Sequence, residues 1–378
     1  MIFSKKTSVQ NGIDALQDTA FLLKGKRIGL ITNASGVNRR GVATTQLIAE
    51  KYNLSVLFSP EHGINSTLQA GFGEESVKDK ETGAEIINIY RPIESEVDAS
   101  FDKIDIVVYD IQDVGARYYT YLYNLSYLMR KCAKFDKEIV VFDRINPIGG
   151  TAIEGCLLDT SRFSSGIGEF EIPIRYGLTV GEFARFINKE YNISCKLNVI
   201  NCRAWKRSMF GDETDLLWVN PSPNMPSVNA AINYIATCVF EATNISEGRG
   251  TTRPFDMIGA PFVDSKRLCD AMNAIKLPGV IFRRVSFSPE FSKYAKETCH
   301  GVELHITDRR EYSPFEAMLY LYRELSYYKE FDASYNGVCK RVGNDCLCGD
   351  FIDPKAIISQ NRRALSEYKN KASKYLIY

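Results

Sequence analysis

The sequence predicts an α/β protein in which a Rossmann-like, doubly wound parallel sheet is followed by a second, smaller α+β domain. Short runs of β-branched and other apolar residues alternate with helix-length segments through the first 150 residues. Such uniformly apolar runs are typical of parallel strands that helices cover on both faces. Right-handed crossovers between these strands give an open, doubly wound sheet. The chain has 378 residues, which is long enough for two domains.

The first domain, residues 1–150, is expected to hold five strands and to carry the catalytic groups. The apolar runs that predict the strands are residues 27–33, 54–58, 86–90, 104–109 and 138–142. Helices are expected at residues 42–50 and 119–134, where apolar residues recur at helical spacing.

The pattern becomes less regular after Gly149 and Gly150, which predicts a second domain over residues 151–378 that completes an active-site cleft. The predicted helices are residues 180–191, 228–240, 264–275, 314–328 and 354–378. The predicted strands are residues 196–199, 280–287 and 301–307. A mixture of this kind indicates an α+β arrangement.

The overall charge and hydropathy exclude several partners. The formal net charge is +1, so neither a nucleic-acid groove nor a basic membrane face is expected. No stretch approaches 18 consecutive apolar residues, and a membrane span is therefore not expected. Residues 1–6 are followed by polar residues without the apolar stretch of an export signal. We expect a cytoplasmic protein, or a secreted one if a signal was trimmed.

Metal and cofactor sites are also not expected. The ten cysteines are scattered without a CxxC pair, which favours reduced core thiols over zinc sites or disulfides. There are only three histidines, His62, His300 and His305, and they form neither HxH nor HExxH. The loop after the first strand lacks GxGxxG, and GxxxxGK[ST] is absent. No nicotinamide, flavin or nucleotide cofactor is therefore predicted.

Polar and ionisable residues follow the predicted strands of the first domain at their carboxyl ends. They are Glu61 and His62, then Asp110, Gln112 and Asp113, then Asp143 and Asn146. The carboxyl ends of parallel strands lie along one edge of a sheet, so these side chains are expected to converge on one ligand. Crowded carboxylates perturb one another's protonation, as acid–base catalysis requires. Instead of belonging to an acid–base site, each aspartate could cap the N-terminus of the helix that follows it. Glutamate is a poor N-cap, so Glu61 is the stronger candidate for the acid–base site.

Two segments of the second domain are candidates for ligand contacts. Residues 218–226 place three prolines around Asn220 and Asn224, which makes a stiff loop with amide donors and acceptors. Residues 241–255 hold further candidates, namely Glu241, Asn244, Glu247, Arg249 and Arg253. An arginine there could clamp an anionic group, and the alternative is a surface turn with internal salt bridges.

Six segments together resemble the NamZ-type exo-β-N-acetylmuramidases over nearly the whole chain. They are residues 58–63, 110–121, 143–150, 220–226, 241–252 and 287–300. The resemblance implies an exo-acting enzyme that releases N-acetylmuramic acid from the non-reducing ends of peptidoglycan-derived glycans or muropeptides. It also implies a Rossmann-like domain joined to a smaller C-terminal domain, with the active site in the cleft between them.

The resemblance places the catalytic glutamate at Glu61, within Pro60-Glu61-His62-Gly63, as the general acid that protonates the leaving oxygen. Asp110 or Asp113 is expected to orient a water or to hold the substrate's acetamido group. The lactyl carboxylate is expected to meet Arg117, Arg249 or Arg253. The other expected substrate contacts are His62, Gln112, Tyr118, Tyr119, Asp143, Asn146, Asn220, Asn224, Glu241, Asn244 and Glu247.

Two other functions remain open from the sequence. The first is a non-catalytic protein that binds the same sugar or muropeptide. The second is a Mg²⁺-dependent phosphoryl-transfer enzyme with the metal on Asp110, Asp113 and Asp143. The crowding of carboxylates at the sheet edge argues against a pure binder of an anionic sugar. The sequence does not predict the stereochemical course, the leaving group or the oligomeric state.

Overall fold

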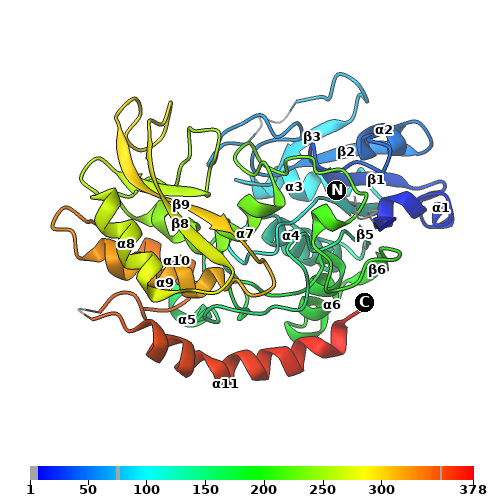
Figure 1. The fold of residues 1–378 in the computed structure, drawn as a ribbon. Helices are drawn as coiled ribbons and strands as arrows, with labels where there is room; N and C mark the ends of the chain where they lie inside the picture. The colour runs from blue at the N-terminus through cyan, green and yellow to red at the C-terminus, as the bar shows by residue number, and fades with distance from the viewer. Residues whose placement is uncertain (1–6, 74–76, 350) are drawn as a thin grey trace.

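The chain forms two packed parts in the computed structural model, which describes residues 7–73, 77–349 and 351–378. The first part is built on a six-stranded parallel sheet, and the second on a three-stranded antiparallel sheet. Figure 1 shows the two parts side by side, with the larger sheet at the right. The predicted fold class is therefore confirmed. Residues 1–6, which bear on the expectation about export, lie outside the described residues.

The larger sheet has the strand order β3-β2-β1-β4-β5-β6, with every neighbouring pair parallel. Its strands are β1 (Arg27–Thr32), β2 (Asn53–Ser59), β3 (Glu85–Asn88), β4 (Ile106–Asp110), β5 (Glu138–Phe142) and β6 (Lys196–Ile200). The chain adds strands outward in one direction up to β3 and then continues on the other side of β1 with β4. The point where the direction reverses is thus the carboxyl edge between β1 and β4.

Because both faces of the larger sheet are buried, its central strands are mostly apolar. In β4, Ile106 and Val108 belong to the apolar cluster on one face, and Val107 and Tyr109 belong to the cluster on the other. Successive side chains point to opposite faces of a sheet, so a strand covered on both sides has to be apolar throughout. The uniformly apolar runs in the sequence reflect this double burial.

Helices cover both faces of the larger sheet. They are α1 (Ala20–Leu23), α2 (Thr44–Ala49), α3 (Glu94–Phe101), α4 (Tyr121–Lys134) and α6 (Val180–Glu190), and short 3-10 turns lie at Gly12–Ala15 and Gly211–Glu213. The short helix α5 (Thr160–Phe163) packs instead against α10 (Tyr335–Val342) of the second part. The start of α6 is fixed by a capping box, in which the Thr179 side chain accepts from the Glu182 amide and Glu182 bonds back to the Thr179 amide. Helices α4 and α6 pack against each other.

The second part packs helices against its small sheet. Its strands are β7 (Met257–Ala260), β8 (Val280–Phe287) and β9 (Cys299–Ile306), in the order β7-β9-β8. Its helices are α7 (Val228–Thr237), α8 (Ser265–Ile275), α9 (Pro314–Ser326) and α10 (Tyr335–Val342), and a 3-10 turn, Cys238–Ala242, follows α7. Buried residues of α7 and α9 share one apolar cluster with residues of the larger sheet, so the two parts have a continuous core.

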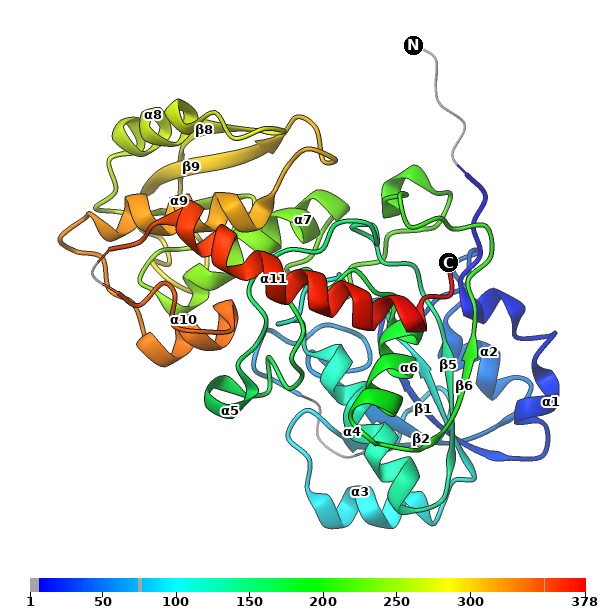
Figure 2. The same ribbon diagram turned by 90° about the horizontal axis from the view of Figure 1, so that it is seen from below.

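The last helix, α11 (Pro354–Ala372), joins the two parts. Figure 2 shows α11 running from the smaller part back to the larger one, where the chain ends beyond a 3-10 turn, Ser373–Tyr375. Tyr368 of this helix donates to the carbonyl oxygen of Tyr176 at 2.8 Å, and the terminal Tyr378 donates to Asp143 at 2.8 Å. The C-terminus is therefore anchored at the carboxyl ends of β5 and β6.

The structure differs from the sequence-based expectations at several elements. Strand β6, which was expected in the second domain, pairs in parallel with β5, so the first sheet extends past residue 150. The sequence did not predict α3, β7 or α10, which are all short. None of the helices in the described ranges combines the length and apolar character that crossing a bilayer requires.

Candidate active site

A cavity with a volume of 460 Å³ lies where loops of the first part meet the second part. This volume falls within the range of about 300–1,000 Å³ that small-molecule sites usually have. The first part contributes Glu61, His62, Ala70, Gly71, Tyr90, Tyr118, Tyr119, Thr120, Tyr121, Ser165, Gly166 and Ile167. The second part and the loop leading to it contribute Ser222, Asn224, Met225, Tyr234, Glu241, Arg249, Phe255, Lys340 and Arg341. We call this space the inner cavity.

A tight turn at the end of β2 presents Glu61 to the inner cavity. Its next two residues, His62 and Gly63, both have positive φ, of 72° and 79°. A positive φ is uncommon for histidine, and such strain is often found at functional sites. The His62 amide donates to the Phe72 carbonyl, and its ring Nδ1 lies 2.8 Å from the Leu68 carbonyl oxygen. His62 therefore holds the turn, while Glu61 points to the cavity.

Both carboxylate oxygens of Glu61 have a hydrogen-bond donor. The Gly71 amide donates to Oε1 at 2.8 Å, and the Thr120 hydroxyl donates to Oε2 at 2.9 Å. The side chain is buried, with 8% of its surface exposed. Burial and the charge of Glu61 raise the pKa of Tyr90, so the two side chains are close neighbours. Glu61 is thus fixed in orientation before any substrate arrives.

Tyrosines make one wall of the inner cavity. Tyr118 and Tyr234 meet edge to face with ring centroids 5.0 Å apart, and Tyr119 packs against Tyr234 at 6.0 Å. The Tyr118 hydroxyl donates to the carbonyl oxygens of Tyr234 and Ile235. Burial raises the pKa of Tyr119, so its hydroxyl stays protonated and is a hydrogen-bond donor. An aromatic wall with a polar edge suits a sugar ring.

Three cations also line the inner cavity, and two of them share a carboxylate. Arg249 and Arg341 bind Glu241 at 2.7 and 2.8 Å. Burial alone would lower the pKa of Arg249, but the carboxylates of Glu241 and Glu247 outweigh it and raise that pKa. The third cation is Lys340, which forms no ion pair with the described part of the chain. The cavity therefore offers one ammonium group to an anionic ligand.

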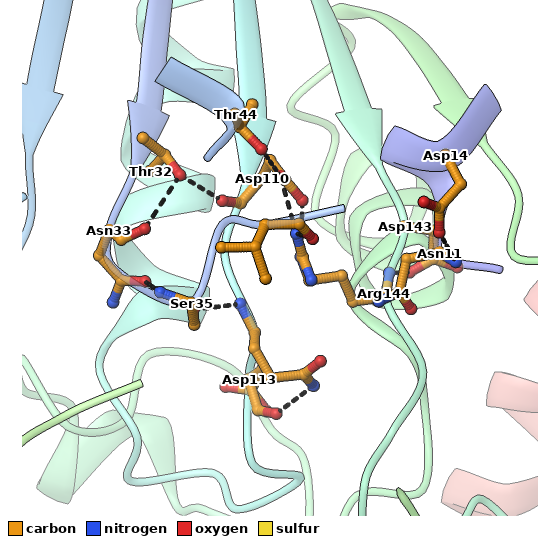
Figure 3. A network of polar contacts seen from close by, with 12 residues as sticks. Asn11, Asp14, Thr32, Asn33, Ser35, Thr44, Asp110, Asp113, Asp143 and Arg144 are labelled. Atoms are coloured by element: carbon orange, nitrogen blue, oxygen red, sulfur yellow. Dashed lines mark hydrogen bonds and ion pairs between the residues drawn. The ribbon is translucent and has the colours of Figure 1, made fainter. Parts of the chain in front are cut away.

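Asp110 does not reach the inner cavity, because it is paired at the edge between β1 and β4. The Arg144 Nε and Nη2 atoms donate to its two oxygens at 2.6 and 2.8 Å, and Thr44 donates to it as well. Figure 3 shows Arg144 and Thr44 pointing toward Asp110. Asp110 and Arg144 are both buried. A dinucleotide would usually occupy this switch point, but here an ion pair fills it.

Asp113 and Asp143 are also buried away from the inner cavity. The Oδ2 atom of Asp113 accepts from the Gly115 amide at 2.7 Å and from the Tyr176 hydroxyl. Burial raises the pKa of Asp113 to about 7, against these donors. Burial likewise raises the pKa of Asp143 to about 6, and its partners include Gly181, Thr179 and Tyr378. Both carboxyl groups connect loops of the fold.

Arg117 holds the fold together and does not reach the inner cavity. It is fully buried and donates to the carbonyl oxygens of Cys156, Ile172 and Arg341. Its bond to Arg341 fixes the C-terminal end of α10, the helix that carries Lys340. Arg117 thus affects the cavity only indirectly, because it holds the end of α10 in place.

The remaining predicted contacts divide between structural positions and a second cavity. Gln112, Asn146 and Asn244 bond to backbone carbonyls, and Glu247 binds Arg249 and Lys293. Asn220 is exposed. Arg253 binds Asp256 and Glu303 and lines a different cavity.

The structure therefore brings together seven of the predicted site residues at the inner cavity. They are Glu61, His62, Tyr118, Tyr119, Asn224, Glu241 and Arg249. Sequence reasoning missed Tyr90, Thr120, Tyr121, Ser222, Tyr234, Lys340 and Arg341. Thr120 and Tyr121 lie in the same segment, residues 110–121, as Tyr118 and Tyr119, so that segment could have suggested them. Lys340 and Arg341 lie on a helix without any motif, and no signal in the sequence marks them.

No cluster of three or more histidine, cysteine, aspartate or glutamate side chains within the described residues has metal-binding geometry. Asp110, Asp113 and Asp143 do not share a site, because each is bonded to a different set of groups. The arrangement that a phosphoryl-transfer enzyme would use for Mg²⁺ does not form from these three.

Comparison with known proteins gives matches over almost the entire chain. The model for the N-terminal part of the exo-β-N-acetylmuramidase NamZ matches residues 28–229, and the model for its C-terminal part matches residues 232–378. A peptidoglycan β-N-acetylmuramidase NamZ of Bacillus subtilis (strain 168) is 40% identical over 384 residues, which cover 99% of this chain and 92% of that protein.

Two crystal structures of DUF1343 family proteins from Bacteroides fragilis NCTC 9343 have the same fold. One has a TM-score of 0.90 and 31% identity, and the match covers 99% of this chain and 100% of the other. The second has a TM-score of 0.80 and 28% identity, with 98% and 99% covered.

Proposed function

This chain belongs to the NamZ family of exo-β-N-acetylmuramidases and is a glycoside hydrolase of peptidoglycan, and we propose that it releases N-acetylmuramic acid from non-reducing ends with Glu61 as general acid. The observation that carries the proposal is the position of Glu61. It is the one acidic side chain of the inner cavity that is not paired with a cation in the described structure, since Glu241 binds Arg249 and Arg341.

The hydrogen bonds of Glu61 indicate which oxygen carries the proton. Oε1 accepts from the Gly71 backbone amide, which is a donor only. Oε2 faces the Thr120 hydroxyl, which can donate or accept. Protonation at Oε2 therefore costs no hydrogen bond, because the threonine hydroxyl can reverse its role. In the proposed reaction, Oε2 gives its proton to the glycosidic oxygen as the bond to the anomeric carbon breaks.

The second group in the reaction is proposed to come from the substrate. Classical glycosidases use two carboxyl groups, one on each side of the scissile bond. The second carboxyl group of the inner cavity, Glu241, is neutralised by its two arginines, and Asp110 and Asp113 do not reach the cavity. The 2-acetamido carbonyl oxygen of N-acetylmuramic acid can attack the anomeric carbon in its place. The Tyr119 hydroxyl, on the aromatic wall, is a donor that could orient this group.

Lys340 is proposed to recognise the lactyl carboxylate. Arg249 and Arg341 already share Glu241, whereas Lys340 has no carboxylate partner among the described residues. An ammonium group without a counterion in a partly buried cavity favours an anionic ligand. N-acetylglucosamine lacks the lactyl group, so this contact would distinguish the two sugars.

The test of the proposal compares Glu61→Gln with the unmodified protein on a short glycan that ends in N-acetylmuramic acid, because a sugar leaving group needs a proton from the general acid. Glutamine keeps the shape and can accept the Gly71 bond, but it has no proton to donate, so turnover should fall about 10²- to 10⁴-fold. Binding, measured by calorimetry, should persist. Glu367→Gln on α11, whose carboxylate is exposed, is the matched control and should turn over normally. Normal turnover by Glu61→Gln would remove it as the acid.

The stereochemical course is tested by NMR on a short glycan that ends in N-acetylmuramic acid. Participation of the acetamido group gives two inversions at the anomeric carbon, so the sugar released first should be the β-anomer. An initial α-anomer would mean that water attacks directly, and another residue would have to act as the base. If prolonged incubation releases no sugar from this glycan, the chain acts as a binding protein.

The cellular location is proposed from the cysteines. All ten are free in the structure, and eight of them are buried. Free thiols in this number favour a reducing compartment, where disulfides rarely form. We therefore propose that the protein acts on peptidoglycan fragments inside the cell. Cell fractionation with an antibody to the chain tests this proposal, and recovery in the external medium would contradict it.

A further inference from the structure

A second cavity, of 790 Å³, adjoins the inner cavity, and we call it the outer groove. Its lining residues are Gln69, Pro223, Asn224, Gly250, Thr251, Thr252, Arg253, Met257, Arg283, Ser286, Phe287, Ser288, Glu290, Phe291 and Glu303. Asn224 lines both spaces. Neither the family assignment nor the proposed chemistry gives the outer groove a role.

Three chain segments pass from the inner cavity into the outer groove. Residues 69–71 place Gln69 in the groove and Gly71 in the cavity. Residues 222–225 place Pro223 in the groove and Ser222 and Met225 in the cavity. Three segments that cross in this way mean that the two spaces are neighbours.

The third crossing segment, residues 249–253, is held rigidly. Arg249 faces the inner cavity, and the following residues line the outer groove. Gly250 has a φ of 86°, and the Glu290 amide donates to its carbonyl oxygen at 2.9 Å. A Cβ at Gly250 would lie 2.4 Å from the Phe291 carbonyl oxygen, so the glycine is required for this approach. The loop that carries Arg249 therefore has a fixed conformation where it lines the outer groove.

Asn224, which lines both spaces, is bonded to an amide side chain of the outer groove. The Nδ2 atom of Asn224 donates to Oε1 of Gln69 at 3.2 Å. Each amide keeps a further donor or acceptor for a ligand that passes between the spaces. Asn224 lies in the stiff proline-rich loop, whose neighbour Pro221 accepts bonds from Asn33 and Tyr121 of the first part.

The chemistry of the outer groove suits carbohydrate. Phe291 leaves 40% of its surface exposed, and an aromatic face covers the C–H groups of a sugar ring. Thr252 and Ser288, whose side chains carry hydroxyl groups, are among the lining residues. Arg253 and Arg283 both bind Glu303 and are about half exposed, so their remaining N–H groups can donate to sugar oxygens.

We infer that the outer groove binds the leaving-group glycan, that is, the sugars attached to the N-acetylmuramic acid that is released. The inference rests on the proposed function, which places the cleaved sugar in the inner cavity. The leaving oxygen has to lie beside Glu61, so the rest of the glycan must leave through a connected opening. We assign that opening to the outer groove, because it adjoins the inner cavity along the three crossing segments and the Gln69–Asn224 pair.

The experiment compares two substrates that differ only in the leaving group: a 4-nitrophenyl glycoside of N-acetylmuramic acid, and a tetrasaccharide that begins with the same sugar. Phe291→Ala removes the exposed ring, so kcat/KM for the tetrasaccharide should fall about tenfold, as loss of one aromatic contact predicts. Activity on the nitrophenyl glycoside should stay within about twofold. Phe291→Tyr keeps the ring and should retain tetrasaccharide activity.

Phe21→Ala is the matched control, because Phe21 lies on α1, is 74% exposed and lines neither space. It should leave both substrates unaffected. If Phe291→Ala lowers kcat/KM equally for both substrates, or for neither, the outer groove is not the leaving-group site, and the proposed function still stands. If the unmodified protein cleaves neither substrate, the proposed function fails, and this inference fails with it.

Discussion

The Thr120 hydroxyl donates to Oε2 of Glu61 at 2.9 Å, although Thr120 is also the N-cap residue of α4. An N-cap threonine commonly uses its side chain to bond the first turn of its helix. Here the side chain makes no such bond. The hydroxyl is directed instead to a carboxylate that arrives from the end of β2, so the start of α4 positions the proposed acid.

Thr120→Val tests this relationship. Valine keeps the shape but removes the hydroxyl, so Oε2 loses the partner that fixes its orientation. A hydrogen bond between uncharged groups contributes about 0.5–1.5 kcal/mol, so kcat should fall about 2- to 10-fold, with KM changed less. Steady-state kinetics on a short glycan that ends in N-acetylmuramic acid, whose sugar leaving group needs the proton, measure both constants. Thr120→Ser restores the hydroxyl and should recover most of the rate; a valine variant with normal kcat would contradict the positioning role.

Lys340→Met should weaken recognition of the lactyl group. Methionine keeps the length of the side chain and removes the charge, so the inhibition constant of free N-acetylmuramic acid should rise about tenfold. The inhibition constant of free N-acetylglucosamine, which has no carboxylate, should not change. Lys340→Arg keeps the charge and should preserve most of the discrimination. Equal loss of affinity for both sugars would show that Lys340 contributes to the shape of the cavity and not to this selectivity.

The strands of the larger sheet could be predicted because each is buried on both faces. Val107 and Val108 enter different apolar clusters, and this burial leaves a continuous apolar run in the sequence. The helix α10 was missed because it is short, and only its residues Val338, Cys339 and Val342 are buried. The apolar period of such a helix is too brief to stand out.

The site was predictable only where a local motif marks it. The turn after β2 carries Glu61 and His62 in consecutive positions, so the motif and the geometry coincide. Asp110 is the last residue of β4, and the rule of carboxyl ends places it on the correct edge. That rule does not say whether a cation from a neighbouring loop occupies the edge. Here Arg144, which follows β5, binds Asp110.

Asp110→Asn should therefore destabilise the fold and leave the chemistry of the folded molecules intact. The substitution leaves the buried Arg144 guanidinium without its carboxylate, and breaking a buried pair costs about 3–5 kcal/mol. Urea denaturation measures this loss. Asp270→Asn breaks the exposed pair with Lys266 and should cost no more than about 1 kcal/mol. A stable Asp110→Asn protein without activity would instead support the catalytic role that the sequence suggested.

Asp113 should make the stability of the protein depend on pH. Burial raises the pKa of this carboxyl from 3.8 to about 7, so the folded state holds the proton more tightly than the unfolded state does. The stabilising contribution is fully present below pH 3.8 and is lost as the pH rises through about 7. In that window the free energy of unfolding should fall with pH, by at most about 1.4 kcal/mol per unit from this group.

Asp113→Asn removes the titrating group and can still accept from the Gly115 amide and the Tyr176 hydroxyl. The variant should therefore lose less stability than the unmodified protein between about pH 4.5 and 7.5, as measured by urea denaturation at each pH. Asp143, whose pKa burial raises to about 6, contributes with the same sign in both proteins and cancels in the comparison. Parallel pH profiles for the two proteins would mean that Asp113 is ionised in the folded state throughout this range.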